Sequence, residues 1–148
     1  MSESPNFVGV YFYAMDAKNR LAIPFKIRFA IKRPRELVIS CGLEGCLNLY
    51  QGEVWRRIGE KLETMPLKNK SEQRAFKRML YASACEVEFD DEGRILIPQN
   101  LASYADLKRE AAIIGVGEKI EIWSKPRWTA YEKKQRSAFQ RYASQLEI

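Results

Sequence analysis

Four basic side chains near the start of the chain have the types and spacing expected of a site that binds a polyanion. Lys18 and Arg20 follow Asp16 in the segment Asp16-Ala-Lys-Asn-Arg20, and Lys26 and Arg28 come shortly afterwards. A lysine offers a point charge to a phosphate, whereas an arginine presents a planar fork that can donate two hydrogen bonds to a guanine edge. These residues therefore indicate binding of nucleic acid. A solvated basic surface without a ligand is the alternative, because charged runs are common on protein surfaces.

The chain has few side chains of the kinds that catalyse reactions. The sequence contains no histidine, which excludes Ser-His-Asp and Cys-His activation of a nucleophile and removes the commonest zinc ligand. Asp90, Asp91 and Glu92 form an acidic group, but a single turn offers no cleft in which their pKa values could diverge. We therefore predict that the protein is not an enzyme and uses no metal and no cofactor.

The basic segment is part of a motif that occurs twice. Asp16-Ala-Lys-Asn-Arg20-Leu-Ala-Ile-Pro24 returns as Asp90-Asp-Glu-Gly-Arg94-Ile-Leu-Ile-Pro98, displaced by 74 positions (94 − 20). Aromatic residues downstream also recur, at a displacement of 73 (128 − 55), in the pairs Tyr50 with Trp123 and Trp55 with Trp128. Internal similarity of this kind indicates a tandem duplication. We predict one pseudo-symmetric unit over residues 1–148.

Both copies of the motif also predict a structural role. The side chains of Asp16 and Asp90 can accept hydrogen bonds from backbone N–H groups of their own turns. Asn19 stands where the second copy has Gly93, and both residue types tolerate the positive φ of a tight turn. We expect Arg94 to pair with a carboxylate or stack on a neighbour, because the acidic residues of its turn would repel phosphate.

The two copies differ in charge. Residues 14–39 contain seven basic and two acidic residues, for a net charge of +5, whereas residues 88–113 contain three basic and six acidic residues, for a net charge of −3. The whole chain has a formal net charge of +6. A motif present twice with opposite surface charge indicates a structural framework of which only the first copy faces a polyanion.

Residue periodicity predicts an α+β fold, mainly β, in which short strands and turns position the basic residues. Repeat one is expected over about 7–65, with a strand at 7–15, a helix at 25–31, a hairpin at 37–50 and a helix at 53–64. A linking helix follows at about 71–83. Repeat two is expected over about 84–131, with a strand at 85–89, a helix at 99–105, a hairpin at 111–123 and a C-terminal helix at about 125–148.

Two further expectations concern the helices. Trp55, Trp123 and Trp128 lie on apolar periods, which favours packing in the core, where they would hold the two halves together. The charged tail from Tyr131 is either a helix that contacts a partner or a partly frayed end.

The repeated motif resembles that of the MraZ family of transcriptional regulators. The resemblance extends from about Phe7 to Tyr131. It rests on Phe7-x-Gly9, Asp16-Ala-Lys-Asn-Arg20, Ile23-Pro24, Arg28, Cys46-Leu47, Tyr50, Trp55, Arg78, Asp90-x-x-Gly93-Arg94, Ile97-Pro98, Ile114-Gly115 and Glu121-Ile-Trp123.

The resemblance implies a swapped-hairpin barrel of the AbrB type with flanking helices and both copies in one chain. It also implies a ring of subunits in the cytoplasm, at the nucleoid, that binds short direct repeats of double-stranded DNA upstream of a cell-division and cell-wall gene cluster and represses it. By position, the DNA-binding residues would be Lys18 and Arg20, with Lys26 and Arg28. A protein-interaction or antitoxin-like module on the same fold is the alternative, in which the basic face meets an acidic protein. No apolar run is long enough to span a bilayer, so we expect no membrane partner.

Overall fold

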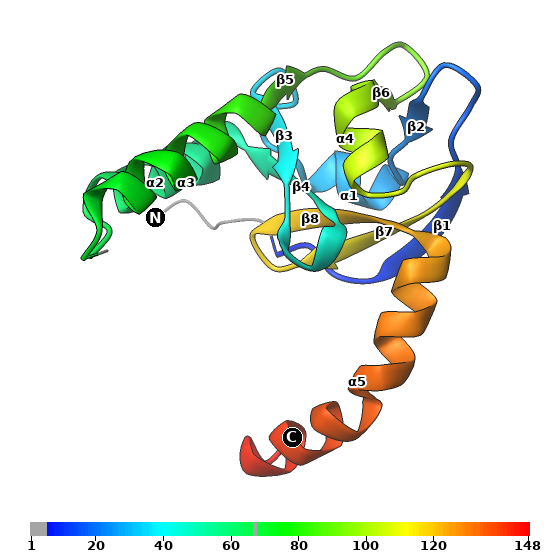
Figure 1. Ribbon diagram of the computed structural model, residues 1–148. Helices are drawn as coiled ribbons and strands as arrows, with labels where there is room; N and C mark the ends of the chain where they lie inside the picture. The colour runs from blue at the N-terminus through cyan, green and yellow to red at the C-terminus, as the bar shows by residue number, and fades with distance from the viewer. Residues whose placement is uncertain (1–5, 67) are drawn as a thin grey trace.

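The chain alternates short strands with helices in the computed structural model of the protein, which describes residues 6–66 and 68–148 (Figure 1). Repeat one contains β1 (Val10–Ala14), β2 (Arg20–Ala22), α1 (Phe25–Ala30), β3 (Leu37–Cys41), the 3-10 helix η1 (Leu43–Gly45), β4 (Leu47–Gln51) and α2 (Gly52–Glu63). The linking helix α3 (Lys70–Ser83) follows. Repeat two contains β5 (Cys85–Val87), β6 (Arg94–Leu96), α4 (Gln99–Tyr104), β7 (Glu110–Val116), β8 (Lys119–Ser124) and α5 (Lys125–Gln145).

The two repeats exchange strands. The large sheet has six antiparallel strands in the order β1-β7-β8-β4-β3-β5, so β1 of repeat one pairs with the hairpin of repeat two. In return, β5 of repeat two pairs with β3 of repeat one. β2 and β6 form a separate two-stranded ribbon. The predicted α+β class with swapped hairpins is therefore confirmed.

The register shows how closely the halves are related by a pseudo-twofold axis. In the ribbon, Leu21 lies opposite Ile95, which is its own equivalent in the other repeat. At the centre of the large sheet, Asn48 of β4 likewise lies opposite its equivalent, Glu121 of β8. The pseudo-twofold axis therefore passes through both pairs, and each half is completed by elements of the other.

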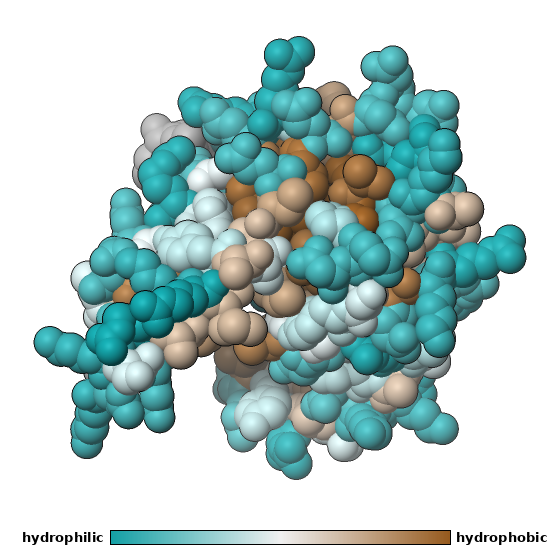
Figure 2. Space-filling model, turned by 45° about the horizontal axis from the view of Figure 1, so that its top comes forward, coloured by the Kyte–Doolittle hydropathy of each residue, from teal (hydrophilic) through white to brown (hydrophobic). Residues whose placement is uncertain are grey.

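The core lies between the ribbon and one face of the large sheet. Strand alternation turns Leu47 and Leu49 of β4 toward this core, while Asn48 and Tyr50 lie on the opposite, outer face of the sheet. Leu21 of the ribbon packs into the same core. On the side of the molecule shown in Figure 2, hydrophilic residues cover most of the surface and hydrophobic residues gather in a central patch.

Proline or serine stands at the start of α1, α4 and α5. Pro24 and Pro98 precede α1 and α4, where a residue without a backbone N–H loses no hydrogen bond. The Ser124 hydroxyl accepts a hydrogen bond from the backbone N–H of Arg127 and caps α5. Figure 1 shows α2 and α3 running side by side, whereas α5 extends away from the sheets. The C-terminal segment is thus a helix, with its last turns exposed.

The structure corrects the predicted ends of two strands. β1 begins at Val10 rather than at residue 7, because Gly9 adopts a positive φ of 93° and leaves Phe7 in an isolated bridge with Gly117. β5 ends at Val87 rather than at residue 89.

The expected role of the tryptophans, to hold the two halves together, is met by Trp123 and not by Trp55. Trp55 contacts Tyr50 and Tyr81, and so fixes α2 against its own hairpin and α3. Trp123 contacts Trp128 of α5 and lies in one buried cluster with Cys46 of repeat one. Each tryptophan cluster therefore anchors a helix to the hairpin of its own repeat, and the cluster of Trp123 also joins the two repeats.

Candidate nucleic-acid interface

Two turns at the ribbon carry the repeated motif, and their backbones are built alike. In the first turn (residues 16–20), the Asp16 carboxylate accepts hydrogen bonds from the backbone N–H groups of Lys18, at 2.9 Å, and Arg20, at 2.8 Å. In the second turn (residues 90–94), the Asp90 carboxylate accepts them from Glu92 and Arg94, both at 2.9 Å. The motif therefore specifies the turn through the aspartate.

Positive φ angles at matching positions complete the likeness of the turns. Asn19 has a φ of 60° and Gly93 a φ of 75°. Glycine reaches this region without steric cost, and asparagine is among the residues that tolerate it. The exchange of Asn for Gly between the repeats thus leaves the backbone unchanged.

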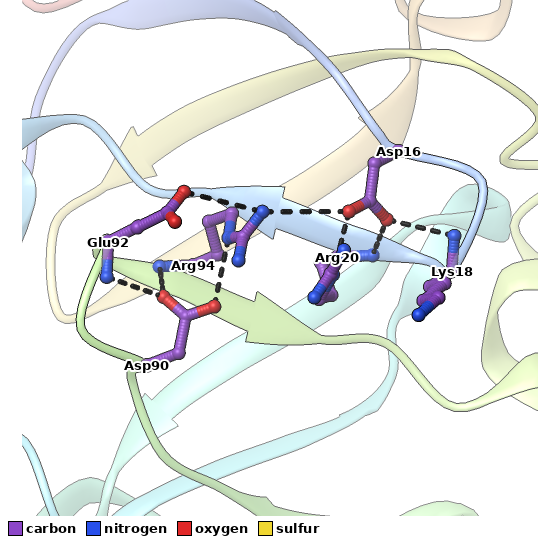
Figure 3. Close-up of polar contacts among 6 residues, drawn as sticks. All are labelled: Asp16, Lys18, Arg20, Asp90, Glu92 and Arg94. Carbon is purple, nitrogen blue, oxygen red and sulfur yellow. Dashed lines mark hydrogen bonds and ion pairs between the residues drawn. The ribbon is translucent and has the colours of Figure 1, made fainter.

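The arginines of the two turns differ in how many carboxylates they meet. Arg20 Nε lies 2.7 Å from Asp16 Oδ2, and Arg94 Nε lies 2.9 Å from Asp90 Oδ2. Arg94 also extends one terminal nitrogen to within 3.6 Å of Asp16 and 3.5 Å of Glu92. Figure 3 shows Arg94 reaching from its own turn toward Asp16. Three acids therefore surround Arg94, whereas the only carboxylate near Arg20 among the described residues is that of Asp16.

Hydrogen bonds to the two aspartates favour their ionised forms. The backbone N–H of Arg20 is the main cause that lowers the pKa of Asp16, and the backbone N–H of Arg94 does the same for Asp90. The acidic neighbours of Arg94, above all Asp90, raise its pKa further. Both turns are thus held by ionised carboxylates at neutral pH.

The ribbon exposes the face that carries the two arginines. Leu21 and Ile95 point into the core and are fully buried. The alternate positions of β2 and β6 hold Arg20 and Arg94, which are half-buried, and Leu96, which is 59% exposed. A two-stranded ribbon is one of the elements that fit the major groove of B-DNA. The first turn adds the exposed Lys18 at one end of this face, whereas the second turn adds the exposed Asp91 and Glu92.

The two basic residues of α1 have different environments. Lys26 is exposed. Arg28 is half-buried, donates from Nε to the Ile23 carbonyl at 2.9 Å and packs its guanidinium over the second turn. A Cβ added to Gly93 would lie 2.6 Å from the Arg28 guanidinium carbon, so the absent side chain of Gly93 makes room for Arg28.

Two exposed aromatic residues of α1 were not predicted as part of this surface. Phe25 is 66% and Phe29 79% exposed, and their ring centroids lie 5.8 Å apart. The equivalent positions in repeat two are the polar residues Gln99 and Ser103. Aligning the two α-helical segments of the repeats would have drawn attention to the pair, because the other copy of the helix has polar residues at both positions.

Among residues 6–66 and 68–148, no cluster of three or more Cys, Asp or Glu side chains is arranged to hold a metal ion. Within the same residues, the helices are too short or too polar to cross a membrane.

Comparison with known proteins agrees with the tandem architecture. The family described as "MraZ protein, putative antitoxin-like" matches residues 7–79 and again residues 80–146. The chain belongs to the MraZ family. A relative from Clostridium beijerinckii, "Transcriptional regulator MraZ", is 45% identical over 127 residues, which cover 86% of this chain and 87% of the relative. A protein of the same name from Heliobacterium modesticaldum is 39% identical over 140 residues, covering 95% of this chain and 96% of the relative. The MraZ relatives are thus named as regulators of transcription and not as enzymes.

Proposed function

We propose that this protein is a sequence-specific DNA-binding transcriptional regulator. The function class rests on its membership of the MraZ family and on the names of its relatives. By the same resemblance, we propose that it binds short direct repeats upstream of a cell-division and cell-wall gene cluster and represses that cluster. Such a regulator would act in the cytoplasm, at the nucleoid.

The observation that carries the site assignment is the different state of the two ribbon arginines. The Arg20 guanidinium uses Nε to bind Asp16, which leaves its two terminal nitrogens to donate a bidentate pair to a guanine edge. Arg94 has the same geometry but faces two further carboxylates, which would repel a phosphate backbone. The proposal therefore assigns base recognition to Arg20.

The remaining basic residues have supporting parts in this proposal. Lys18 and Lys26 are exposed and would contact phosphates, which contribute affinity without reading the sequence. Arg28 is the least available of the four, because its guanidinium packs over Gly93. It would hold α1 in place beside the ribbon and contact phosphate only with its outer nitrogens.

A ring of subunits would allow such small contacts to give a useful affinity for DNA. One exposed turn offers few contacts, and its affinity for a single DNA repeat would be low. Several turns placed on successive repeats would add through effective concentration. We therefore propose that a ring-shaped homo-oligomer is the DNA-binding species, which sedimentation of the free protein and of its DNA complex would test.

The direct test is a comparison of the protein's own upstream DNA with a scrambled duplex, by fluorescence anisotropy over a salt series. Preference for the native repeats and a steep loss of affinity with salt are expected. Arg20→Ala should lose about 1–3 kcal/mol of discrimination per contacted repeat, whereas Arg94→Ala is the matched control and should keep the preference. Equal binding of both duplexes by the wild-type protein would overturn the proposal.

The exposed aromatic pair favours one second candidate, a module that binds an acidic protein. Phe25 and Phe29 lie on a basic helix, and an acidic partner with apolar anchors would match them. Phe25→Gln with Phe29→Ser introduces the residues of repeat two and should leave DNA preference intact. Loss of a co-purifying acidic protein in this variant, without any DNA preference in the wild type, would favour the second candidate.

A further inference from the structure

A cavity of about 930 Å³ lies against the outer face of the large sheet, beneath the helix pair α2 and α3. This volume and a mainly apolar lining are typical of small-molecule sites. The walls from α2, α3 and the segment between them are apolar side chains: Ile58, Leu62, Met65, Phe76, Met79 and Leu80. The cavity lies on the side of the sheet opposite the core and does not include the first turn, so its role is separate from the proposed DNA contacts.

The floor of the cavity is polar and incompletely satisfied. Asn48 is 5% exposed and donates from Nδ2 to the Tyr50 hydroxyl at 2.8 Å, while its own Oδ1 has no hydrogen-bond partner among the described residues. The Tyr50 hydroxyl accepts this bond and, within the described part of the chain, donates to no acceptor. Burial raises the pKa of Tyr50, so the hydroxyl keeps its proton and remains a donor.

Two lysines stand beside this floor. Lys119 lies 3.3 Å from Glu121 and lines the cavity together with Lys61. Lys61 has no ion-pair partner among the described residues. A hydroxyl donor and two ammonium groups at one end of an apolar cavity are the features that would hold an anionic head group, because charge-assisted hydrogen bonds are stronger than neutral ones.

The corresponding place in repeat two holds larger side chains. Tyr50 and Ile58 have Trp123 and Tyr131 as their equivalents, at a displacement of 73 (131 − 58), and these two rings pack with centroids 4.9 Å apart. Trp128 closes the same cluster, 5.4 Å from Trp123. The hollow at this place in repeat two is smaller, about 540 Å³, and Trp128, Tyr131 and polar residues of α5 line it, whereas the smaller Ile58 leaves more room in repeat one.

We propose that this cavity binds an amphipathic organic anion, with its apolar chain between α2 and α3 and its carboxylate at Tyr50, Lys61 and Lys119. The ligand would carry a single negative head group and an apolar chain long enough to fill the space between the apolar walls of the cavity. The mouth of the cavity is apolar as well, since Leu43 is 75% and Met79 72% exposed. Those residues would cover the part of the chain that leaves the cavity.

The test uses the full-length protein and dodecanoate, titrated below its micelle concentration by calorimetry. Saturable binding of one dodecanoate per subunit is expected, with markedly weaker binding of dodecanol, which has the same chain and no charge. Lys61→Gln should weaken dodecanoate binding roughly tenfold and leave dodecanol unchanged. Lys133→Gln, which removes an exposed charge from α5, is the matched control and should bind as the wild type does.

Ile58→Tyr introduces the residue of repeat two, puts a larger ring into the cavity wall and should abolish binding without changing the preference for native DNA. If this variant fails to fold, Met79→Glu places a negative charge at the exposed mouth and should weaken dodecanoate binding instead. Non-saturable binding, or equal binding by the Ile58→Tyr or Met79→Glu protein, would overturn the proposal. A Met79→Glu protein that changes its oligomeric mass while binding dodecanoate normally would show that a second copy covers this face, and would also overturn it.

Discussion

The first and second turns have the same backbone and opposite surroundings. Each turn is fixed by an aspartate that accepts two backbone hydrogen bonds and by a residue with positive φ. In the first turn the arginine meets one carboxylate, whereas in the second it meets three. The comparison teaches that the motif encodes the turn, and that the residues between the aspartate and the arginine decide what the turn can bind.

The second turn also supports the first across the pseudo-twofold axis. Arg94 of repeat two approaches Asp16 of repeat one, and Arg28 of repeat one covers Gly93 of repeat two. Backbone hydrogen bonds run the same way, from Ile23 to Gly93 and from Ile97 to Asn19. Stability is therefore shared by both turns, while the proposed binding belongs to one.

We expect the largest effect from truncating the buried residues of the ribbon, which tests whether β2 and β6 contribute equally to stability. Leu21 and Ile95 lie opposite each other and are fully buried, so Leu21→Ala and Ile95→Ala should each lower the free energy of unfolding by about 2–5 kcal/mol. Urea unfolding at a fixed protein concentration measures this. Leu96→Ala, at an exposed position of the same ribbon, is the control and should stay within about 0.5 kcal/mol of wild type. A strong loss at only one of the two buried positions would contradict a shared core.

If the charged residues of the first turn bind DNA, replacing them with those of the second turn should lower DNA affinity. Ala17→Asp with Lys18→Glu gives the first turn the residues of the second. We expect it to lower DNA affinity roughly tenfold or more and to reduce the slope of log affinity against log salt by about one per lost phosphate contact.

The reverse exchange in the second turn serves as its counterpart. Asp91→Ala with Glu92→Lys should raise affinity for any DNA duplex while adding no preference for the native repeats, because a terminal nitrogen of Arg94 stays near Asp16 and is not available to a base edge. Anisotropy titrations of both double variants decide the matter. If the exchange in the first turn left affinity and salt slope unchanged, the assignment of binding to that turn would be wrong.

Exchanging the positive-φ residues should have a smaller effect, confined to one turn. Gly93→Asn would put a Cβ against the Arg28 guanidinium and should cost about 1–2 kcal/mol of unfolding free energy. Asn19→Gly should cost less than about 0.5 kcal/mol, because glycine adopts the same φ and loses only the exposed hydrogen bond to Gln99.

Removing Arg28 isolates the cause of that difference. In an Arg28→Ala background the Gly93→Asn change should cost less than in the wild type, since the added side chain no longer meets a guanidinium. Thermal unfolding of the four proteins in this cycle measures the coupling. Equal costs in both backgrounds would show that the backbone conformation alone, and not the contact with Arg28, restricts Gly93.

The repeated motif made much of this fold predictable from sequence. Each copy of the motif has an aspartate, then a residue that tolerates positive φ, then a proline, at the same spacing. Local chemistry at these three positions determines a turn, a short strand and the start of a helix. The first residue of β1 was harder to predict from sequence, because the positive φ of Gly9 depends on packing against repeat two. Local signals therefore predicted the elements better than their ends.

Contacts between distant residues could not be predicted in the same way. The approach of Arg94 to Asp16 and the cover of Gly93 by Arg28 exist only because the halves exchange strands. Trp55 contacts Tyr81 of the linking helix, an element that has no counterpart in the repeat. The charge difference between the turns, by contrast, was already present in the sequence, since it depends on residue type alone.

The smallest effect is expected on stability at low pH, where Asp16 and Asp90 should contribute differently. Both have a pKa lowered from 3.8, so the stability that their ionised forms contribute is present above that value and is lost as the pH falls through the lower pKa of the folded state. Asp16 meets both Arg20 and Arg94, whereas Asp90 meets Arg94 alone. Asp16→Asn should therefore flatten the acid limb of a thermal-midpoint profile between about pH 5 and pH 2 more than Asp90→Asn does. Both substitutions keep an oxygen that can accept the backbone hydrogen bonds, so a change in the profile reports the charge. If both variants retained the wild-type acid limb, other carboxylates would determine acid stability, and the two turns would be alike in this respect as well.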